Sequence, residues 1–353
     1  MLDYIHETSI VGKEILSDKE KIVGPLVKHY KTKDYRKIVI IASGSSYNAS
    51  TTARLFMEKN LHIDVKVITP FTFEHYENNF LDDTFIFAIS QSGRSTNIIS
   101  VLKKLRELGR ETIVLTGFPK SDVKHHSDVV IDLNIGIETV GYVTKGYTNS
   151  ALFLMLFSLA AVNHREVLNY EHQIAEALNI HEEIIKQSLD FYQKHKSIFL
   201  RMKRLQICGY GSNYGTALEG ALKIGETFGV PASPYELEEF MHGGYLELTP
   251  ENVVILIDSD GKGHERTIEV YKALRNITKK VFIIGSEKLP EDEYVLRFNY
   301  KMTEWVSPLI LVVFFQVLSY MICTDLDIWE KEQYINAFEK QINSKTEKPD
   351  YLK

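Results

Sequence analysis

The amino-acid sequence predicts an α/β protein made of two tandem parallel sheets with flanking helices. Short apolar runs rich in β-branched residues alternate with helical stretches, which is the pattern of β-α-β units around a parallel sheet. The turn at residues 44–47 (GSSY) recurs at residues 211–214 (GSNY), and the apolar run at residues 84–89 recurs at residues 252–257. This self-similarity indicates an internal repeat, so we expect two copies of one five-strand fold.

The elements are expected in the same order in both copies. Strands of the first copy are expected at residues 37–42, 62–68, 84–89, 112–116 and 129–133, with the first helix at residues 48–59. Strands of the second copy are expected at residues 204–209, 252–257, 280–284 and 294–298. The predicted organisation is an N-terminal helical extension, a first subdomain, a helical connection, a second subdomain and a tail, at residues 1–36, 37–165, 166–200, 201–327 and 328–353.

Composition excludes several classes of protein. The chain has 353 residues, of which 44% are hydrophobic and 25% charged, so it is neither disordered, collagen-like nor a disulfide-stapled miniprotein. The net charge of −6 argues against a nucleic-acid binder. Two cysteines cannot form a disulfide framework or a cysteine-rich metal site, and they favour a cytoplasmic location. Residues 305–323 lack charges but include Pro308 and Gln316, so a buried core helix is expected there rather than a membrane span.

Hydroxyl-rich turns follow two strands of the first copy. Residues 90–97 (SQSGRSTN) place four hydroxyls and a glycine at a strand-to-helix junction, and residues 43–46 (SGSS) have the same chemistry. A helix N-terminus offers free N–H groups and partial positive charge, so these turns predict a phosphate site. Capping of the helix is the alternative for each turn alone. The matching turn at residues 258–261 (DSDG) carries two carboxylates that would repel phosphate, so one phosphate site is expected, in the first copy.

A charged stripe is expected on the helix that follows residue 215. Glu219, Lys223 and Glu226 are spaced i, i+4 and i+7 and therefore share one helix face. The other residues from 217 to 225 are small or apolar, so this helix is expected to be mostly buried. Buried charges need partners, and a carboxylate in a dry pocket suits removal of a proton next to a carbonyl. An exposed ion pair on a surface helix is the alternative.

The turn at residues 90–93, with residues 44–46 upstream, resembles the sugar isomerase (SIS) domain family. The duplication resembles the isomerase half of glucosamine-6-phosphate synthase and the ketosamine-6-phosphate deglycases, over about residues 37–327. The resemblance implies two flavodoxin-like SIS subdomains, and no cofactor or metal. It also implies a sugar-phosphate site with the following residues: Gly44, Ser45, Ser46, Ser90, Gln91, Ser92 and Ser95. Arg94 replaces an acidic residue of the synthase, and it could bind phosphate, reach another anionic part of a substrate or simply face solvent.

The same resemblance assigns roles to the charged helix. Residues 217–226 (ALEGALKIGE) resemble the family segment that carries the catalytic glutamate, which matches Glu226. Lys223 would line the sugar pocket, and Glu219 would orient Lys223.

Three more segments carry expected site residues through the resemblance. Residues 239–243 (EFMHG) resemble the E-x-x-H-G motif, whose histidine, His242 here, opens the sugar ring or protonates the leaving group. In the synthase this histidine comes from the neighbouring subunit, so a homodimer with shared sites is implied. Thr144 lies in a loop that would close over the sugar, or it caps the following helix. Lys345 could be the tail lysine that reaches the sugar carbonyl, or it belongs to a solvated helix end.

The function expected is that of a phosphosugar enzyme. Residues 1–36 leave no room for a glutaminase or DNA-binding domain, so we expect a stand-alone enzyme without glutaminase activity, nucleic-acid partner or membrane association. The preferred interpretation is a deglycase that cleaves a 6-phosphorylated ketosamine to a hexose 6-phosphate and an amine by enolisation. The alternatives are an aldose–ketose isomerase, an amino-sugar-phosphate deaminase and a non-catalytic sugar-phosphate-binding regulator.

Overall fold

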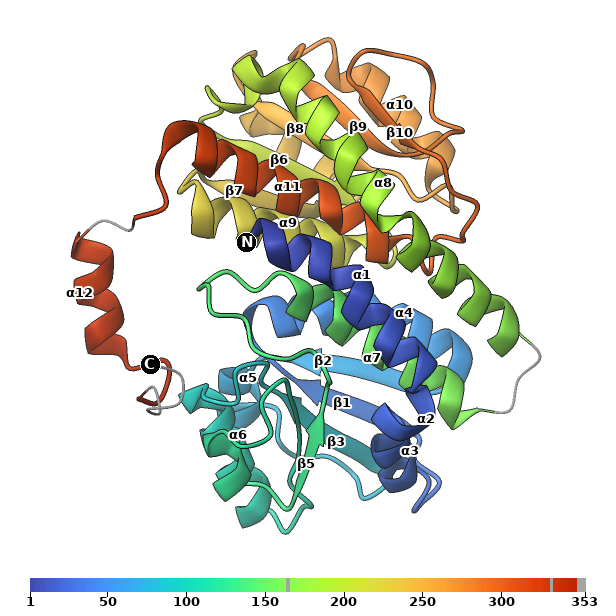
Figure 1. Cartoon of the computed structure of the whole chain (residues 1–353), viewed down its shortest axis with the longest axis vertical. Helices are drawn as coiled ribbons and strands as arrows, with labels where there is room; N and C mark the ends of the chain where they lie inside the picture. The colour runs from blue at the N-terminus through green and yellow to red at the C-terminus, as the bar shows by residue number, and fades with distance from the viewer. Residues whose placement is uncertain (163–165, 331–332, 348–353) are drawn as a thin grey trace.

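The computed structural model describes residues 1–162, 166–330 and 333–347 and contains two parallel five-stranded sheets. The first sheet has the order β2-β1-β3-β4-β5 (Figure 1). Its strands are β1 Lys37–Ile41, β2 Asp64–Ile68, β3 Thr84–Ile89, β4 Ile113–Thr116 and β5 Val129–Asp132. All five strands were expected from the sequence. The order reverses between β1 and β3, which is where open α/β sheets place their ligands.

The second sheet repeats this topology, with the order β10-β9-β8-β6-β7. Its strands are β6 Leu205–Gly209, β7 Ala232–Glu236, β8 Val253–Ile257, β9 Val281–Ser286 and β10 Val295–Phe298. Strand β7 was not located in the sequence, because ASPYE contains a proline and no apolar run. Proline is tolerated there because β7 is an edge strand and pairs only with β6. The duplicated fold is therefore confirmed, with five strands in each half.

Helices fill the space between the two sheets and cover their outer faces (Figure 1). Helices α4 Gly44–Leu61, α7 Lys145–Ala161, α9 Asn213–Thr227 and α11 Pro308–Leu326 pack against one another between the sheets, together with α1 Leu2–Ser17. The remaining helices and single 3-10 turns are α2 Lys19–Ile22, α3 Gly24–Tyr30, α5 Pro70–His75, α6 Thr96–Glu107, η1 Asp122–His125, α8 Val167–Phe199, η2 Glu239–His242, η3 Gly244–Glu247, α10 His264–Leu274 and α12 Gln333–Ile342. Helix α12 stands apart from the body of the molecule (Figure 1).

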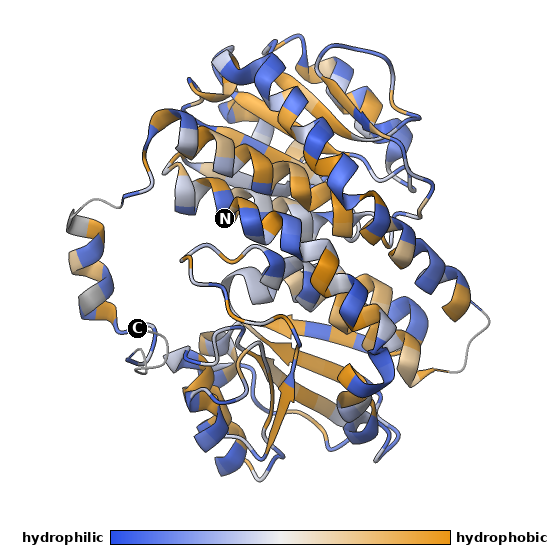
Figure 2. Cartoon of the chain, viewed as in Figure 1, coloured by the Kyte–Doolittle hydropathy of each residue, from blue (hydrophilic) through white to orange (hydrophobic). Residues whose placement is uncertain are grey.

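One hydrophobic core joins the two halves. It contains residues of both sheets and of the helices between them, which appear as orange segments in Figure 2. Helices α4 and α9 approach so closely that a Cβ atom on Gly215 would lie 2.0 Å from the hydroxyl of Thr52. Glycine is therefore required at this crossing. The expectation that the two halves pack tightly is confirmed, and the consequence is that side chains of α4 and α9 share one site.

Helix α11 is long and apolar enough to cross a membrane, alone among the helices of the described ranges. However, 72% of its apolar window is buried inside the protein. Its side chains contact α8 and α9 and belong to the common core. The expectation of a buried core helix is confirmed.

His181 on α8 is a buried histidine that should make stability depend on pH. The residue is 1% exposed, and neither ring nitrogen has a hydrogen-bond partner among the described residues. Burial lowers its pKa from 6.5 to about 4. The unfolded chain therefore binds a proton between these two pH values while the folded chain does not, so stability falls as the pH drops from 6.5 to 4. The loss of unfolding free energy attributable to His181 should approach about 3 kcal/mol over this pH range.

The test is urea unfolding at pH 7, 5.5 and 4.5, for the wild type and for His181→Leu. We expect the variant to lose less unfolding free energy than the wild type over this range. The matched control is His172→Gln, because His172 is an exposed histidine on the same helix. Equal pH dependence in the wild type and in His181→Leu would show that His181 does not remain neutral in the folded protein.

Candidate active site

The turn between β3 and α6 has the geometry of an anion site. Ser90 is buried, and its hydroxyl lies 3.3 Å from that of Ser95, the residue that precedes α6. Gly93 has φ +64, and a Cβ atom there would meet the side chain of Ser121, so glycine is required. Gln91 and Ser92 line a cavity of about 220 Å³ beside this turn. The predicted phosphate residues of this turn are therefore brought together.

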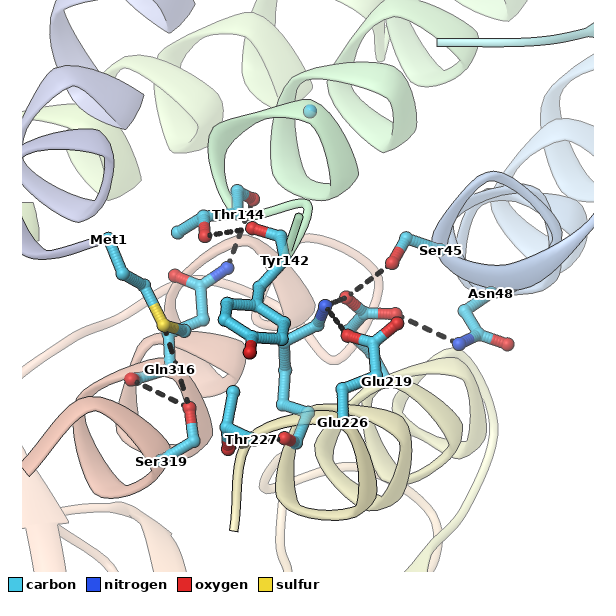
Figure 3. Close-up of polar contacts among 12 residues, drawn as sticks. Met1, Ser45, Asn48, Tyr142, Thr144, Glu219, Glu226, Thr227, Gln316 and Ser319 are labelled. Atoms are coloured by element: carbon cyan, nitrogen blue, oxygen red, sulfur yellow. Dashed lines mark hydrogen bonds and ion pairs between the residues drawn. The ribbon is translucent and has the colours of Figure 1, made fainter. Parts of the chain in front are cut away.

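The second hydroxyl-rich turn begins helix α4 and contacts the other half of the protein. Helix α4 begins at Gly44, which has φ +55, rather than near residue 48 as expected. The hydroxyl of Ser45 donates to Oε1 of Glu219 at 2.9 Å, and Asn48 donates through Nδ2 to Oε2 of the same carboxylate at 2.8 Å (Figure 3). Ser45 thus contacts the charged helix α9 of the other half, whereas Ser46 is partly exposed on the first turn of α4. Asn48 was missed from the sequence, although it lies one helical turn after Ser45.

The charged stripe on α9 forms a chain of ion pairs. Nζ of Lys223 lies 3.6 Å from Glu219 and 2.5 Å from Glu226. Glu219 and Lys223 are fully buried. Burial acts to lower the pKa of Lys223, but the neighbouring carboxylates outweigh burial and raise it, so the ammonium form is held. Burial raises the pKa of Glu219, yet both of its oxygens accept hydrogen bonds, which fits the ionised carboxylate.

Glu226 does not lie in a dry pocket, which corrects the expectation from the sequence. Its side chain is 33% exposed, because it lies near the C-terminal end of α9, where the helix leaves the core. The carboxylate lines two cavities. One, of about 1080 Å³, includes Tyr142 and Trp329, and the other, of about 520 Å³, includes Gly44 and Asn48. The carboxylate of Glu226 is therefore accessible to a ligand, and the ammonium of Lys223 holds this carboxylate in place from the buried side.

The loop before α7 connects the two regions. Glu138 accepts hydrogen bonds from the backbone N–H groups of Thr144 and Gly146, both at 2.8 Å, and burial raises the pKa of its carboxyl. Thr144 is buried and precedes α7, and its hydroxyl donates to the carbonyl of Tyr142 at 3.0 Å. Gly141 lines both the 220 Å³ and the 1080 Å³ cavities. This loop forms a wall of the 220 Å³ cavity at residues 90–95, which we call the anion turn, and also of the 1080 Å³ cavity that Glu226 lines. Thr144 supports the loop from its buried side.

Two residues with predicted catalytic roles lie away from Glu226. His242 is exposed at the end of η2, and neither cavity that Glu226 lines includes it. Lys345 lines the 220 Å³ cavity with Ser92 and Arg94, and Glu226 is not among the lining residues of that cavity. Within the described residues, no group of three or more His, Cys, Asp or Glu side chains could hold a metal ion.

The corresponding turn of the second half is occupied by a side chain. The hydroxyl of Tyr210 accepts hydrogen bonds from the N–H groups of Ser259 at 3.3 Å and Gly261 at 3.1 Å. It donates to Oδ1 of the buried Asp258 at 3.0 Å. The N–H groups that face the ligand in an anion turn are therefore already paired with Tyr210, and Asp258 and Asp260 add negative charge.

Comparisons with known proteins agree with this architecture. A model of the SIS domain matches residues 32–161 and 198–303. Glutamine–fructose-6-phosphate aminotransferase (isomerizing) of Aquifex aeolicus is 27% identical over 308 residues, which are 85% of this chain and 50% of that protein. The chain thus spans about half the length of such relatives.

Solved structures are similar over almost the whole chain. A protein of Clostridium difficile 630, described as a candidate phosphosugar isomerase, is 25% identical with a TM-score of 0.87, and the match covers 98% of both chains. The C-terminal domain of glucosamine-fructose-6-phosphate aminotransferase from Francisella tularensis has a TM-score of 0.83 at 20% identity, over 92% of this chain and 95% of that one. The family model covers both halves, each with the same strand order, and we conclude that the chain belongs to the SIS domain family.

Proposed function

We propose that this protein is a phosphosugar enzyme that cleaves a 6-phosphorylated ketosamine into a hexose 6-phosphate and an amine. The observation that supports the proposal most strongly is that Gly141 lines both the cavity at the anion turn and the larger cavity that Glu226 lines. A substrate with its phosphate at the turn that contains Ser92 would extend past Gly141 towards the carboxylate. Ser90, Gln91 and Ser95 belong to the same turn and complete the proposed phosphate site.

Glu226 is the proposed base. Its carboxylate takes a proton from C1 of the ketosamine, next to the C2 carbonyl, while the carbonyl oxygen takes a proton from solvent, and an enaminol forms. Return of a proton from Glu226 to C2 gives a protonated imine at C1. Water adds to C1 and loses a proton, which gives a carbinolamine. Its nitrogen then takes a proton and the C1–N bond breaks, so that the C1 hydroxyl becomes the aldehyde of the hexose 6-phosphate as it loses its proton, and the amine is released. Lys223 holds Glu226 at 2.5 Å, so the base is oriented before the substrate arrives.

The size and lining of the larger cavity support an amine-bearing substrate. At about 1080 Å³ it is several times larger than the cavity at the anion turn. Its lining combines the carboxylates of Asp327 and Glu330 with the rings of Tyr142 and Trp329, whose centroids are 6.1 Å apart. Carboxylates and aromatic faces both attract an ammonium group. Simple aldose–ketose exchange would leave this space unused.

We also propose that His242 acts from a second copy of the chain. The histidine is exposed and is followed by Tyr245 and by Leu246, which is 73% exposed. A second copy that covers this surface could bring His242 to the Glu226 cavity of its partner, where it would protonate the leaving amine. The proposed assembly is a cytoplasmic homodimer with shared sites.

The proposal is tested by incubating the protein with a panel of fructosamine 6-phosphates, glucosamine 6-phosphate and simple hexose phosphates. We expect release of a primary amine and a hexose 6-phosphate from the first group. Release of ammonia from glucosamine 6-phosphate alone would identify a deaminase, and aldose–ketose exchange without amine loss would identify an isomerase. Binding without turnover of any of these compounds would identify a regulator, and each of these three results would contradict the proposal.

A further inference from the structure

The C-terminal segment pairs with the anion turn, although the two are far apart in the sequence. Ser95 and Lys345 form an antiparallel β-bridge. The N–H of Thr96 donates to the carbonyl of Ser344 at 3.1 Å, and the N–H of Thr346 donates to the carbonyl of Arg94 at 2.9 Å. Residues 344–346 thus pair with the backbone of residues 94–96 through a single β-bridge.

Side chains reinforce this pairing from both sides. The guanidinium of Arg94 donates through Nη2 to the carbonyl of Thr346, and the hydroxyl of Thr346 donates to the carboxylate of Asp122. Arg94 is only 8% exposed. Its Nε atom is buried and has no hydrogen-bond partner among the residues that the structure describes. A buried guanidinium N–H without an acceptor is costly, and a bound anion would satisfy it.

Arg94 and Lys345 line the same cavity as Gln91 and Ser92. In an antiparallel pair, the side chains of opposed residues lie on the same face, so Lys345 lies on the face of Ser95. Glu138 is the acidic member of this lining, and both of its oxygens accept backbone N–H groups of the following loop. Two cations therefore converge on the cavity where the sequence places the phosphate.

We propose that residues 343–347 complete the phosphate pocket, with Lys345 and Arg94 as its two cations, and that phosphate binding and docking of this segment stabilise each other. The proposal rests on the phosphate site of the proposed function. A dianionic phosphate at the turn adds a favourable contact only when the segment is docked, so the two equilibria are linked. It gives Lys345 a role at the phosphate instead of the expected role at the sugar carbonyl.

Binding of inorganic phosphate to the full chain, measured by calorimetry, tests the proposal without any knowledge of the sugar. Lys345→Gln removes an exposed cation and should leave the fold intact, whereas Arg94→Gln also removes the hydrogen bond to Thr346. We expect each variant to bind phosphate about tenfold or more weakly. Lys103→Gln is the matched control, because Lys103 is an exposed cation on α6 that does not line the cavity. It should retain the wild-type affinity.

Limited proteolysis supplies the second readout. Phosphate should slow cleavage within the C-terminal segment in the wild type and in Lys103→Gln, and should give no protection in Arg94→Gln. Wild-type affinity in Lys345→Gln, together with weak binding in Ser92→Ala, would overturn the role of the segment and leave the phosphate site in place. Unchanged affinity in Ser92→Ala would instead show that the phosphate site itself is misplaced.

Discussion

Glu226→Gln is expected to lower kcat on the accepted ketosamine phosphate about 10³-fold, the loss typical for removal of a general base. The amide keeps the size of the side chain but cannot take the proton from C1. Binding of inorganic phosphate should stay within about twofold of wild type, because Glu226 does not line the cavity at the anion turn. Amine release at saturating substrate and phosphate calorimetry give the two values.

The matched control is Glu265→Gln, which removes an exposed carboxylate at the start of α10 and should leave kcat unchanged. Full activity in Glu226→Gln would show that another group is the base.

Mixing Glu226→Gln with His242→Ala under exchange conditions should restore activity, because a mixed dimer then holds one site with both groups intact. Failure of the mixture to recover any activity would count against the shared site.

Lys223→Met is expected to lower the unfolding free energy at pH 7 by about 3 kcal/mol. Methionine fills the space of the side chain, but it leaves the fully buried carboxylate of Glu219 without its cation. Burial already raises the pKa of Glu219, so protonation should relieve part of this cost. The stability loss in Lys223→Met should therefore be smaller at pH 5 than at pH 7, as measured by urea unfolding.

The double variant Glu219→Gln/Lys223→Met is the control for this explanation. It removes both charges, and the amide of Asn48 can rotate to accept a hydrogen bond from the new glutamine. We expect it to regain most of the stability lost in Lys223→Met, since the cost lies in an unpaired charge and not in lost packing. A double variant that is as unstable as Lys223→Met would show that packing around Lys223 is what matters.

The fold was predictable from the sequence because buried parallel strands leave continuous apolar runs. Residues 84–89 and 253–257 form buried strands, and their apolar runs predicted both, the second from residue 252. Strand β7 lacked this signal, because its five residues are half-buried at the edge of the sheet and include Pro234. The start of α4 was placed too late, because Gly44 begins the helix in a left-handed backbone conformation that periodicity does not register.

The candidate site was predictable only where its residues are neighbours in the sequence. The stripe of Glu219, Lys223 and Glu226 follows from helix geometry, and the contacts on α9 agree with it. The contact of Ser45 with Glu219 joins two halves of the chain, so no local pattern indicates it. The pairing of Ser95 with Lys345 depends likewise on how the C-terminal segment returns to the first sheet.

Enolisation by Glu226 is tested most directly by turnover of a fructosamine 6-phosphate in D2O, followed by proton NMR, for the wild type and for Glu226→Gln. We expect the wild type to release the amine and to form a hexose 6-phosphate with deuterium at C2, because the proton returned to C2 comes from solvent-exchanged Glu226. The variant should give neither product at a comparable rate. Amine release without deuterium at C2, or equal rates in both proteins, would contradict enolisation by Glu226.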